Sequence, residues 1–334
     1  MNREINIGII GAGNIVESIH LPILLNIPGV NIKWIFDKDE KRSTLLSGMY
    51  SVDYITGDKL DEGIEEADLC LIAIPYGVRD AYIHKCAAYA KAVYIEKPFA
   101  TTVAEHQAYC ELFAPPDLAI GFQRRYYKCV NELQHIISGS LFGKVQAIYF
   151  NQGYFQLKGG TGFMSDARMS GGGVIIESAI HTLDQILQFT KASALNVEEV
   201  HSLSKSGIDY DTKFTSTLSY DGASFPVYSH VSSLRNLDNG IIIEFENKVV
   251  RLQPAANAVL YVKDANDKKF IELILPESEP GPRSTSVNDA FVRFWEDFIN
   301  AIHSRQSNQT NAVNSMLTST WIEKIYQQIN QPKT

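Results

Sequence analysis

INIGIIGAGNIVESIHLPIL, residues 5–24, carries the pattern that decides the fold of the first part of the chain. Its first six residues, Ile5–Ile10, are almost all apolar and lack polar alternation, which favours a strand buried on both faces. Gly11-Ala12-Gly13 follows at once, and a helical pattern then runs from Asn14 to Leu25. A strand, a glycine turn and a helix in this order predict the first unit of a βαβ fold.

The same alternation continues to about residue 121. Further buried strands are predicted at 30–36, 69–74, 93–95 and 118–120, between helical patterns at 38–46, 78–89 and 101–113. Right-handed βαβ units in this rhythm build a parallel, doubly wound sheet with helices on both faces. We therefore expect residues 1–121 to form an α/β Rossmann domain that binds a dinucleotide.

Residues 122–334 have a different pattern. Helices are predicted at 126–137, 174–189, 287–304 and 312–329, and a long strand at 144–156. Period-2 segments such as KFTSTLSY (213–220), IIIEFE (241–246) and FIELIL (270–275) are separated by turn signals, among them Asp221-Gly222 and Asn239-Gly240. This pattern predicts a second, α+β domain with a large, mostly antiparallel sheet.

Composition limits the classes of partner and compartment. Thirty Lys and Arg residues against 38 Asp and Glu give a formal net charge of −8, which disfavours nucleic acid and anionic membrane surfaces. The four cysteines, at 70, 86, 110 and 129, show neither a CxxC pair nor metal-ligand spacing. No apolar run approaches the ~20 residues of a membrane span, and no signal-peptide pattern opens the chain. We expect a cytoplasmic protein without a metal site.

The glycine turn is most of a dinucleotide fingerprint. Gly11 allows the tight turn, Gly13 lets the backbone approach a pyrophosphate, and Asn14 and Ile15 open the helix whose N-terminus would face that group. Val16 stands where the pattern usually has Gly or Ala. A turn that only requires positive φ is therefore the structural alternative.

Asp37, at the end of the second strand, is the candidate for the adenosine ribose. It lies 24 positions after Gly13, where a carboxylate accepts hydrogen bonds from ribose hydroxyls and repels a 2′-phosphate. Lys38, Lys41 and Arg42 could instead bind that phosphate. We predict NAD as cofactor, with NADP as the open alternative. A solvated helix start capped by Asp37 is the structural alternative.

Three segments resemble the Gfo/Idh/MocA oxidoreductases, the family of glucose–fructose oxidoreductase and inositol dehydrogenase. They are GIIGAGNIVESIHLP (8–22), AIPYGVRDAYIHKCAAYAKAVYIEKPFATT (73–102) and GGGVIIESAIHTLDQ (171–185). The resemblance extends in order over essentially the whole chain. It implies transfer of a hydride between NAD(P) and a CH–OH or C=O carbon of a sugar, cyclitol or sugar derivative.

The resemblance also implies the catalytic residues. Lys97, in the motif Glu96-Lys97-Pro98, would stabilise negative charge on the reacting oxygen. His181 would be the general acid/base, because the pKa of an imidazole lies near neutrality. Glu177, four residues earlier on the same helix face, stands where the family usually has Asp, and would orient Lys97 or His181 or meet the substrate differently. From the residues alone, a surface lysine and a core histidine are the alternatives.

Further contacts are expected at lower specificity. Cofactor contacts are predicted for Ile74, Pro75, Tyr76, Glu96 and Gln123. Substrate contacts are predicted for Arg125, Tyr154, Arg168 and Asp184, with Lys158 considered beside them. For the loop residues in this set a solvated loop is an equal alternative. Tyr76 and Arg79 stand where the family commonly has Asn and His.

The resemblance points to a homodimer or homotetramer built on the C-terminal sheet. One face of that sheet must pack on helices, and we expect the other to expose an apolar patch of Phe, Ile and Val. Two other functions stay open, namely reduction of a non-sugar carbonyl such as a diketone or dihydrodiol, and a catalytically silent dinucleotide sensor. The presence of both Lys97 and His181 favours an enzyme.

Overall fold

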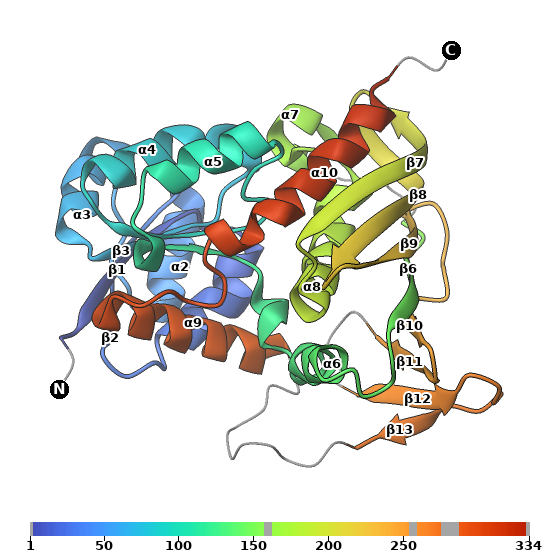
Figure 1. Cartoon of the computed structure of the whole chain (residues 1–334). Helices are drawn as coiled ribbons and strands as arrows, with labels where there is room; N and C mark the ends of the chain where they lie inside the picture. The colour runs from blue at the N-terminus through green and yellow to red at the C-terminus, as the bar shows by residue number, and fades with distance from the viewer. Residues whose placement is uncertain (1–2, 157–161, 254–258, 275–286, 332–334) are drawn as a thin grey trace. The chain divides into compact units, whose positions relative to one another are not determined.

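The computed structural model describes residues 3–156, 162–253, 259–274 and 287–331 (Figure 1). The chain divides into two compact units, the first made of Met1–Gln123 with Phe291–Met316 and the second of Arg124–Ala290 with Leu317–Thr334. The boundary predicted after residue 121 lies within two residues of the first crossing between the units. The sequence pattern did not predict that residues 291–316 return to the first unit.

The first unit is built on a parallel sheet in the order β2-β1-β3-β4-β5. The strands are β1 (Ile5–Ile10), β2 (Val30–Phe36), β3 (Leu69–Ile72), β4 (Ala92–Ile95) and β5 (Leu118–Ile120). Their aliphatic side chains are buried because helices cover both faces of the sheet. The strand order reverses direction at β1, so the end of β1 is the place where such sheets bind ligands.

The helices of this unit follow the predicted pattern, with one addition. They are α1 (Leu21–Leu24), preceded by a π-helical turn at Val16–His20, then α2 (Glu40–Tyr50), α3 (Leu60–Glu66), α4 (Asp80–Ala88) and α5 (Val103–Glu111). The sequence reading missed α3. Late in the chain, α9 (Val287–Ser304) brings Phe294 and Trp295 against Tyr94 of β4, with ring centroids 5.0 and 4.8 Å apart. This aromatic packing explains why residues 291–316 belong to the first unit.

The second unit is built on a mixed, mostly antiparallel sheet in the order β13-β12-β11-β10-β6-β9-β8-β7. The strands are β6 (Val145–Gly153), β7 (Ala194–Lys205), β8 (Ile208–Tyr220), β9 (Ala223–Ser232), β10 (Gly240–Phe245), β11 (Lys248–Leu252), β12 (Leu260–Asp264) and β13 (Ile271–Leu273). Only the β6–β9 pair among these strands is parallel. The two sheets confirm the predicted fold class.

The helices of the second unit are α6 (Lys128–Ser138), α7 (Ala167–Ser170), α8 (Ile180–Thr190) and α10 (Met316–Ile329), and a π-helical turn at Ile175–Ala179 leads into α8. Trp321 of α10 packs on the sheet against Phe214 and donates its indole N–H to Ser216 Oγ at 2.8 Å. None of the helices within the described ranges is long and apolar enough to cross a membrane.

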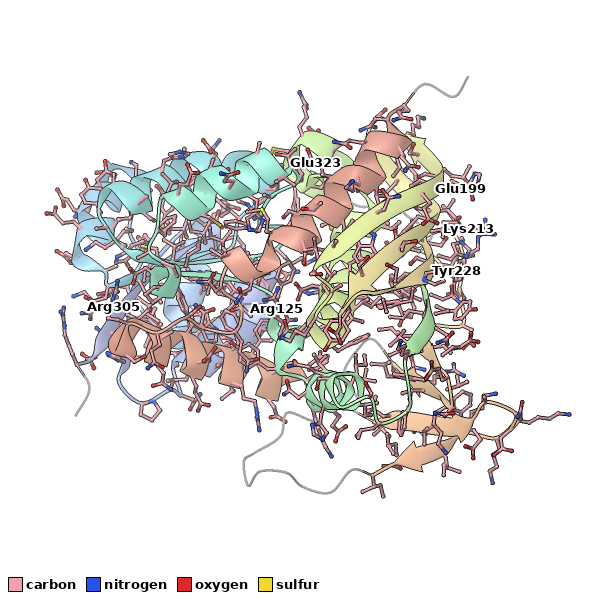
Figure 2. The ribbon with its side chains drawn as sticks, in the orientation of Figure 1. Arg125, Glu199, Lys213, Tyr228, Arg305 and Glu323 are labelled. Atoms are coloured by element: carbon pink, nitrogen blue, oxygen red, sulfur yellow. The ribbon has the colours of Figure 1, made fainter. Side chains whose placement is uncertain are left out.

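The sequence predicted an apolar patch on the open face of this sheet, the face turned away from α8 and α10, and the structure shows that this prediction is wrong. Phe214, Leu218, Phe225 and Ile243 are all buried on the helix side. The alternate positions, which a strand turns to the opposite face, include the exposed Lys213, Tyr149 and Tyr228. Figure 2 shows Glu199, Lys213 and Tyr228 projecting away from α8 and α10. The open face is therefore aromatic and polar, because the strands place their aliphatic residues inward.

Candidate functional site

The two glycines of the first turn have different structural roles. Gly11 has φ +110°, and a Cβ atom on it would lie 2.4 Å from the carbonyl oxygen of Ala73. A Cβ atom on Gly13 would meet no heavy atom within 4 Å. Gly11 is thus required by the backbone itself, whereas Gly13 leaves open space at the end of β1. The dinucleotide pattern requires an unobstructed backbone at this glycine, because the pyrophosphate approaches it closely.

The helix after the turn begins with two backbone bonds to Gly13. The N–H groups of Val16 and Glu17 donate to its carbonyl oxygen at 3.0 and 3.1 Å. The bulky Val16 is fully buried and opens the π-helical turn, a feature that often marks functional sites. Asn14 and Ile15 are exposed at the helix start, and their predicted contacts with a cofactor stay predictions.

Asp37 lies directly beside the glycine turn. Its Oδ2 accepts the Ala12 N–H at 2.7 Å, and its Oδ1 accepts the Asp39 N–H at 2.9 Å. The N-cap of α2 is Asp39, whose side chain accepts the Lys41 N–H. Asp37 is therefore not the helix cap of the structural alternative, and its contact with the adenosine ribose stays a prediction.

Arg42 is engaged with the same turn. Its Nε and Nη2 donate to the Ala12 carbonyl at 3.0 and 2.8 Å, and Nη2 also donates to Glu17 Oε2 at 2.8 Å. Arg42 is one of the three cations that could bind a 2′-phosphate, and its side chain is already hydrogen-bonded to the turn and to a carboxylate. The choice between NAD and NADP stays a prediction.

Glu96, which precedes Lys97 at the end of β4, is the centre of a largely buried network. Trp295 donates its indole N–H to His20 Nδ1 at 3.1 Å, so the His20 proton lies on Nε2, which donates to Glu96 Oε1 at 3.0 Å. Tyr94 Oη donates to the same oxygen at 2.5 Å. Burial alone would raise the pKa of Glu96, but the bonds from His20 and Tyr94 hold it below its ordinary value. Its predicted cofactor contact stays a prediction.

Arg79 fixes the main chain on both sides of Lys97. Its side chain is 2% exposed, and Nη1 donates to the carbonyl oxygens of Glu96, at 2.6 Å, and of Pro98. Nη2 donates to the Ile74 carbonyl at 3.3 Å. Burial lowers the pKa of Arg79 to about 10. One guanidinium thus connects the chain after β3 to the segment that carries Lys97, a role that the sequence reading missed.

The segment after β3 holds the other predicted cofactor residues, Ile74, Pro75 and Tyr76. Tyr76 Oη donates to the Glu105 carboxylate at 2.7 Å, and burial raises the pKa of Tyr76 to about 12. The Arg79 guanidinium lies 5.5 Å from the centre of the tyrosine ring. Because the Tyr76 hydroxyl is already hydrogen-bonded, the ring is the part of this side chain left for other contacts. Gln123, at the end of the unit, is 8% exposed.

Gly172 and Gly173 of the third motif let the start of the helix that carries Glu177 and His181 pack closely against the second sheet. Asp209 of β8 accepts the N–H groups of Gly173 and Ile175 at 2.7 and 3.1 Å, and Tyr326 Oη donates to it at 2.6 Å. A Cβ atom would lie 1.9 Å from the Asp209 carbonyl oxygen if added to Gly173. It would lie 2.0 Å from Tyr326 Oη if added to Gly172. A buried carboxylate thus occupies this helix start, which fixes where Glu177 and His181 lie.

Glu177 and His181 are half-buried and come from different kinds of helical turn. Glu177 belongs to the π-helical turn Ile175–Ala179, and His181 is the second residue of α8. A π turn closes i→i+5 hydrogen bonds, so the angle between these side chains is not the α-helical one that their spacing predicts. Lys97, in the first unit, is also half-buried.

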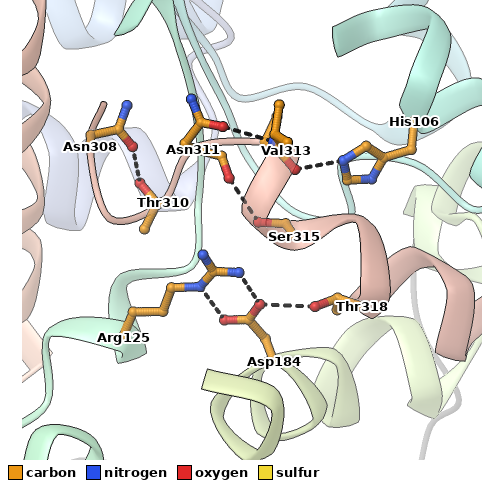
Figure 3. A network of polar contacts seen from close by, with 10 residues as sticks. His106, Arg125, Asp184, Asn308, Thr310, Asn311, Val313, Ser315 and Thr318 are labelled. Carbon is orange, nitrogen blue, oxygen red and sulfur yellow. Dashed lines mark hydrogen bonds and ion pairs between the residues drawn. The ribbon is translucent and has the colours of Figure 1, made fainter. Parts of the chain in front are cut away.

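Arg125 and Asp184 form a buried pair with each other (Figure 3). Arg125 donates from Nε to Oδ2 at 2.8 Å and from Nη2 to Oδ1 at 2.6 Å, and the side chains are 2% and 1% exposed. Thr318 of α10 donates to the same carboxylate at 3.0 Å. This geometry ties α8 to α10 and favours a structural role over the predicted contact with substrate, which stays untested.

The remaining predicted residues lie on the surface. Tyr154 is 57% exposed just after β6, and Arg168 pairs with Asp166 at 2.8 Å in the exposed turn before the glycine motif. Lys158 lies outside the described residues. Among the residues that are described, no group of three or more His, Cys, Asp or Glu is arranged to hold a metal ion.

Figure 3 also shows how the segment between α9 and α10 is fixed within the first unit. The His106 ring on α5 is hydrogen-bonded to the Ala312 carbonyl at 2.8 Å, and the Val313 N–H donates to Asn311 Oδ1 at 2.8 Å. The first bond is buried and the second is partly buried, and they supply partners for the polar groups around the start of the 3₁₀ turn Val313–Ser315.

Solved structures of known proteins share the fold of this chain. The chain resembles the crystal structure of an aldose-aldose oxidoreductase from Caulobacter crescentus complexed with glycerol, with a TM-score of 0.82, 15% identity and coverage of 98% of this chain and 97% of that one. It also resembles a levoglucosan dehydrogenase in complex with NADH, with a TM-score of 0.83, 14% identity and the same coverage. A third similar structure is KijD10, a 3-ketoreductase from Actinomadura kijaniata in complex with NADP and TDP-benzene, with a TM-score of 0.80, 13% identity and coverage of 97% and 98%. At these identities the likeness concerns the fold.

Sequence comparison identifies the first unit. The chain is 27% identical over 146 residues to the uncharacterized oxidoreductase YrbE of Bacillus subtilis (strain 168), a match that spans 43% of this chain and 42% of that protein. Residues 5–119 match the family model GFO_IDH_MocA, described as an oxidoreductase family with an NAD-binding Rossmann fold. Residues 5–119 thus have the sequence of a Gfo/Idh/MocA NAD-binding Rossmann unit.

Proposed function

We propose that the protein is an NAD-dependent oxidoreductase that transfers a hydride between the nicotinamide and a CH–OH or C=O carbon of a sugar, cyclitol or sugar derivative. The observation that carries the cofactor assignment is the glycine turn, with open space at Gly13 and the Asp37 carboxylate bonded to the Ala12 N–H. The names of the aldose-aldose oxidoreductase and the levoglucosan dehydrogenase support the substrate class.

When bound, the nicotinamide donates or accepts the hydride. The protein supplies charge and proton transfer around it. The ammonium of Lys97 stabilises negative charge on the reacting oxygen, and the imidazole of His181 exchanges a proton with that oxygen. Glu177 orients these groups. Arg79 acts through Lys97, since it holds the carbonyl groups of Glu96 and Pro98 on either side of that residue.

Calorimetry with NAD⁺, followed by turnover assays with sugars and cyclitols, tests this proposal. We expect wild-type protein to bind NAD⁺ and to reduce it in the presence of at least one such alcohol. His181→Asn should bind NAD⁺ as well as wild type while losing turnover. NAD⁺ binding without reduction by any of these alcohols or any non-sugar alcohol would instead favour a dinucleotide sensor. Reduction only with diols or hydroxyketones that are not sugars would favour the non-sugar alternative.

A further inference from the structure

Arg124 is a largely enclosed cation that makes only weak contacts within its own unit. It lies in the short turn Gln123–Tyr126, and its Nη1 approaches Thr182 Oγ1 at 3.4 Å and Gln185 Oε1 at 3.5 Å. Both partners are neutral, and both lie on α8, the helix that carries His181. The neighbouring Arg125 differs, because Asp184 accepts two short bonds from it.

The surroundings of Arg124 contain no compensating carboxylate. Burial lowers its pKa, and the titratable groups that act on it are Tyr127, Tyr154 and Cys129, none of which is an acid that ionises below neutrality. No ion pair joins Arg124 to an acidic side chain within the described part of the chain. A guanidinium removed from water without a counter-charge is costly, and such groups are concentrated at functional sites.

Gln185 is a second, independent sign of a missing acceptor. Its side chain is fully buried, and its Nε2 has no hydrogen-bond partner among the described residues. Its Oε1 faces Arg124 Nη1, and Thr182 Oγ1 donates onward to Gln152 Oε1 at 3.3 Å. The cluster therefore has more donors than acceptors. An ionised carboxylate has only acceptors and matches the fork of a guanidinium.

We propose that Arg124 and Gln185 bind a carboxylate of the substrate, so that the enzyme acts on a sugar acid or a related polyhydroxy acid rather than on a neutral sugar. Gln185 and His181 are four residues apart on α8 and share a face of that helix. The carboxylate is thereby placed on the side of the helix that presents the imidazole. This inference rests on the proposed function and deepens it.

Ligand pairs that differ in one group test the proposal. The pairs are gluconate and glucitol, glucuronate and glucose, and galacturonate and galactose, in each of which a carboxylate replaces a CH₂OH group. Binding to the NAD⁺-loaded protein is measured by calorimetry at low and high NaCl. In at least one pair we expect the acid to bind ten or more times more tightly than its neutral partner, with the preference falling as salt rises. Arg124→Met should reduce the affinity for the acid to that for the neutral partner.

Two controls separate ligand binding from a structural role. Lys128→Met removes the same charge four residues further along the chain, from a residue paired with Glu132 at 3.3 Å, and should keep the acid preference. In the ligand-free protein, Arg124→Met should melt no lower than wild type, because an uncompensated cation is lost. Arg125→Met should melt lower, because it leaves the buried Asp184 unpaired.

Four results would overturn the proposal. They are equal binding of acid and neutral partner in all three pairs, an acid preference that survives in Arg124→Met, melting of Arg124→Met as low as that of Arg125→Met, and a loss of NAD⁺ affinity in Arg124→Met. The last result would assign the guanidinium to the cofactor. Acid binding without any NAD⁺ reduction would leave this inference standing and reject the oxidoreductase proposal. NAD⁺ reduction by a neutral polyol, together with equal binding of acid and neutral partner in all three pairs, would reject this inference alone.

Discussion

The imidazole of His20 donates a hydrogen bond to the carboxylate of Glu96 at 3.0 Å, and this bond joins the helix of the glycine turn to the strand end that carries Lys97. Trp295 fixes the tautomer from the other side of the ring. Two sequence motifs that are 76 residues apart are thus connected inside one unit. The same hydrogen-bond network therefore holds both the helix after the glycine turn and the segment that carries Lys97.

The stability of the first unit should depend on the ionised form of Glu96. Because its pKa in the folded protein is depressed, this carboxylate stabilises the fold above the unfolded value of about 4.3, and the contribution is lost as pH falls through the folded pKa. Glu96→Gln should lower the free energy of unfolding at pH 7 by about 1.5–3 kcal/mol, typical of bonds to a charged group. The unfolding free energy of the variant should also vary less with pH on the acid side.

Denaturant unfolding between pH 3 and 7 measures both effects. Asp61→Asn is a suitable control, because Asp61 pairs with Lys85 at the surface and such pairs contribute about 0–1 kcal/mol. Equal losses in the two variants would contradict the prediction.

Arg79 should affect the rate through the position of Lys97. Lysine cannot reproduce its bonds to three carbonyl oxygens, because an ammonium lacks the planar fork of a guanidinium. We expect Arg79→Lys to lower kcat by roughly ten- to a hundredfold, the scale of a misplaced catalytic group, while NAD⁺ affinity is kept. Stopped-flow hydride transfer at saturating substrate checks this. A variant that loses NAD⁺ affinity but keeps kcat would show that Arg79 supports the cofactor instead.

Cofactor choice should respond to both Asp37 and Glu17. Asp37→Ser removes the carboxylate that repels a 2′-phosphate, and Glu17→Gln weakens the bond that holds Arg42 at 2.8 Å. Each change should raise NADP⁺ affinity relative to NAD⁺, on the order of tenfold, equivalent to about 1.4 kcal/mol for one charge contact. Calorimetric Kd values for both dinucleotides are the measurement. If the wild-type protein already binds NADP⁺ more tightly than NAD⁺, the assignment of Asp37 to cofactor choice is wrong.

Self-association through the open sheet face stays a prediction, now with other residues at its centre. Tyr149 and Tyr228 stack with ring centroids 5.2 Å apart on that face, and tyrosine is enriched at protein interfaces. Tyr228→Glu should shift a homo-oligomer to monomer in sedimentation at micromolar concentration, while the secondary structure stays intact. Glu323→Gln, on α10, serves as a control away from the face. A wild-type protein that sediments as a monomer would contradict the prediction.

The local patterns predicted the first unit well because each strand of a parallel sheet is a short aliphatic run, and Gly11 and Asp37 follow such runs directly. They predicted less of the second unit. The hairpin between β7 and β8 turns at Ser206-Gly207, which have φ of 53° and 80°, and its sequence carries no stronger signal than other Ser-Gly pairs.

The roles of Arg79, Arg124 and Arg125 could not be predicted from sequence, because each depends on which distant acceptor the fold places beside the guanidinium. Arg125 meets Asp184, 59 residues away, and Arg79 meets the carbonyl of Glu96, 17 residues away. Arg124 and Arg125 are adjacent in sequence, yet Arg125 is paired with a carboxylate and Arg124 meets neutral groups. The π turn that contains Glu177 could not be predicted from sequence either, because its residues fit an α-helical pattern equally well.

His181 and Lys97 should behave as one functional unit. His181→Asn should fold and bind NAD⁺ while lowering kcat by about 10²–10⁴-fold, the range for loss of a general acid/base. Lys97→Met should have a similar effect because it removes the charge that stabilises the developing alkoxide. In the oxidation direction the wild-type rate should rise with pH as the imidazole loses its proton, and His181→Asn should lack that limb. If both residues act on one oxygen, as proposed, the double variant should be little slower than the poorer single variant. Fully additive losses, or a near-normal rate in His181→Asn, would mean that another group carries the proton, with Tyr154 and Glu177 the first to test.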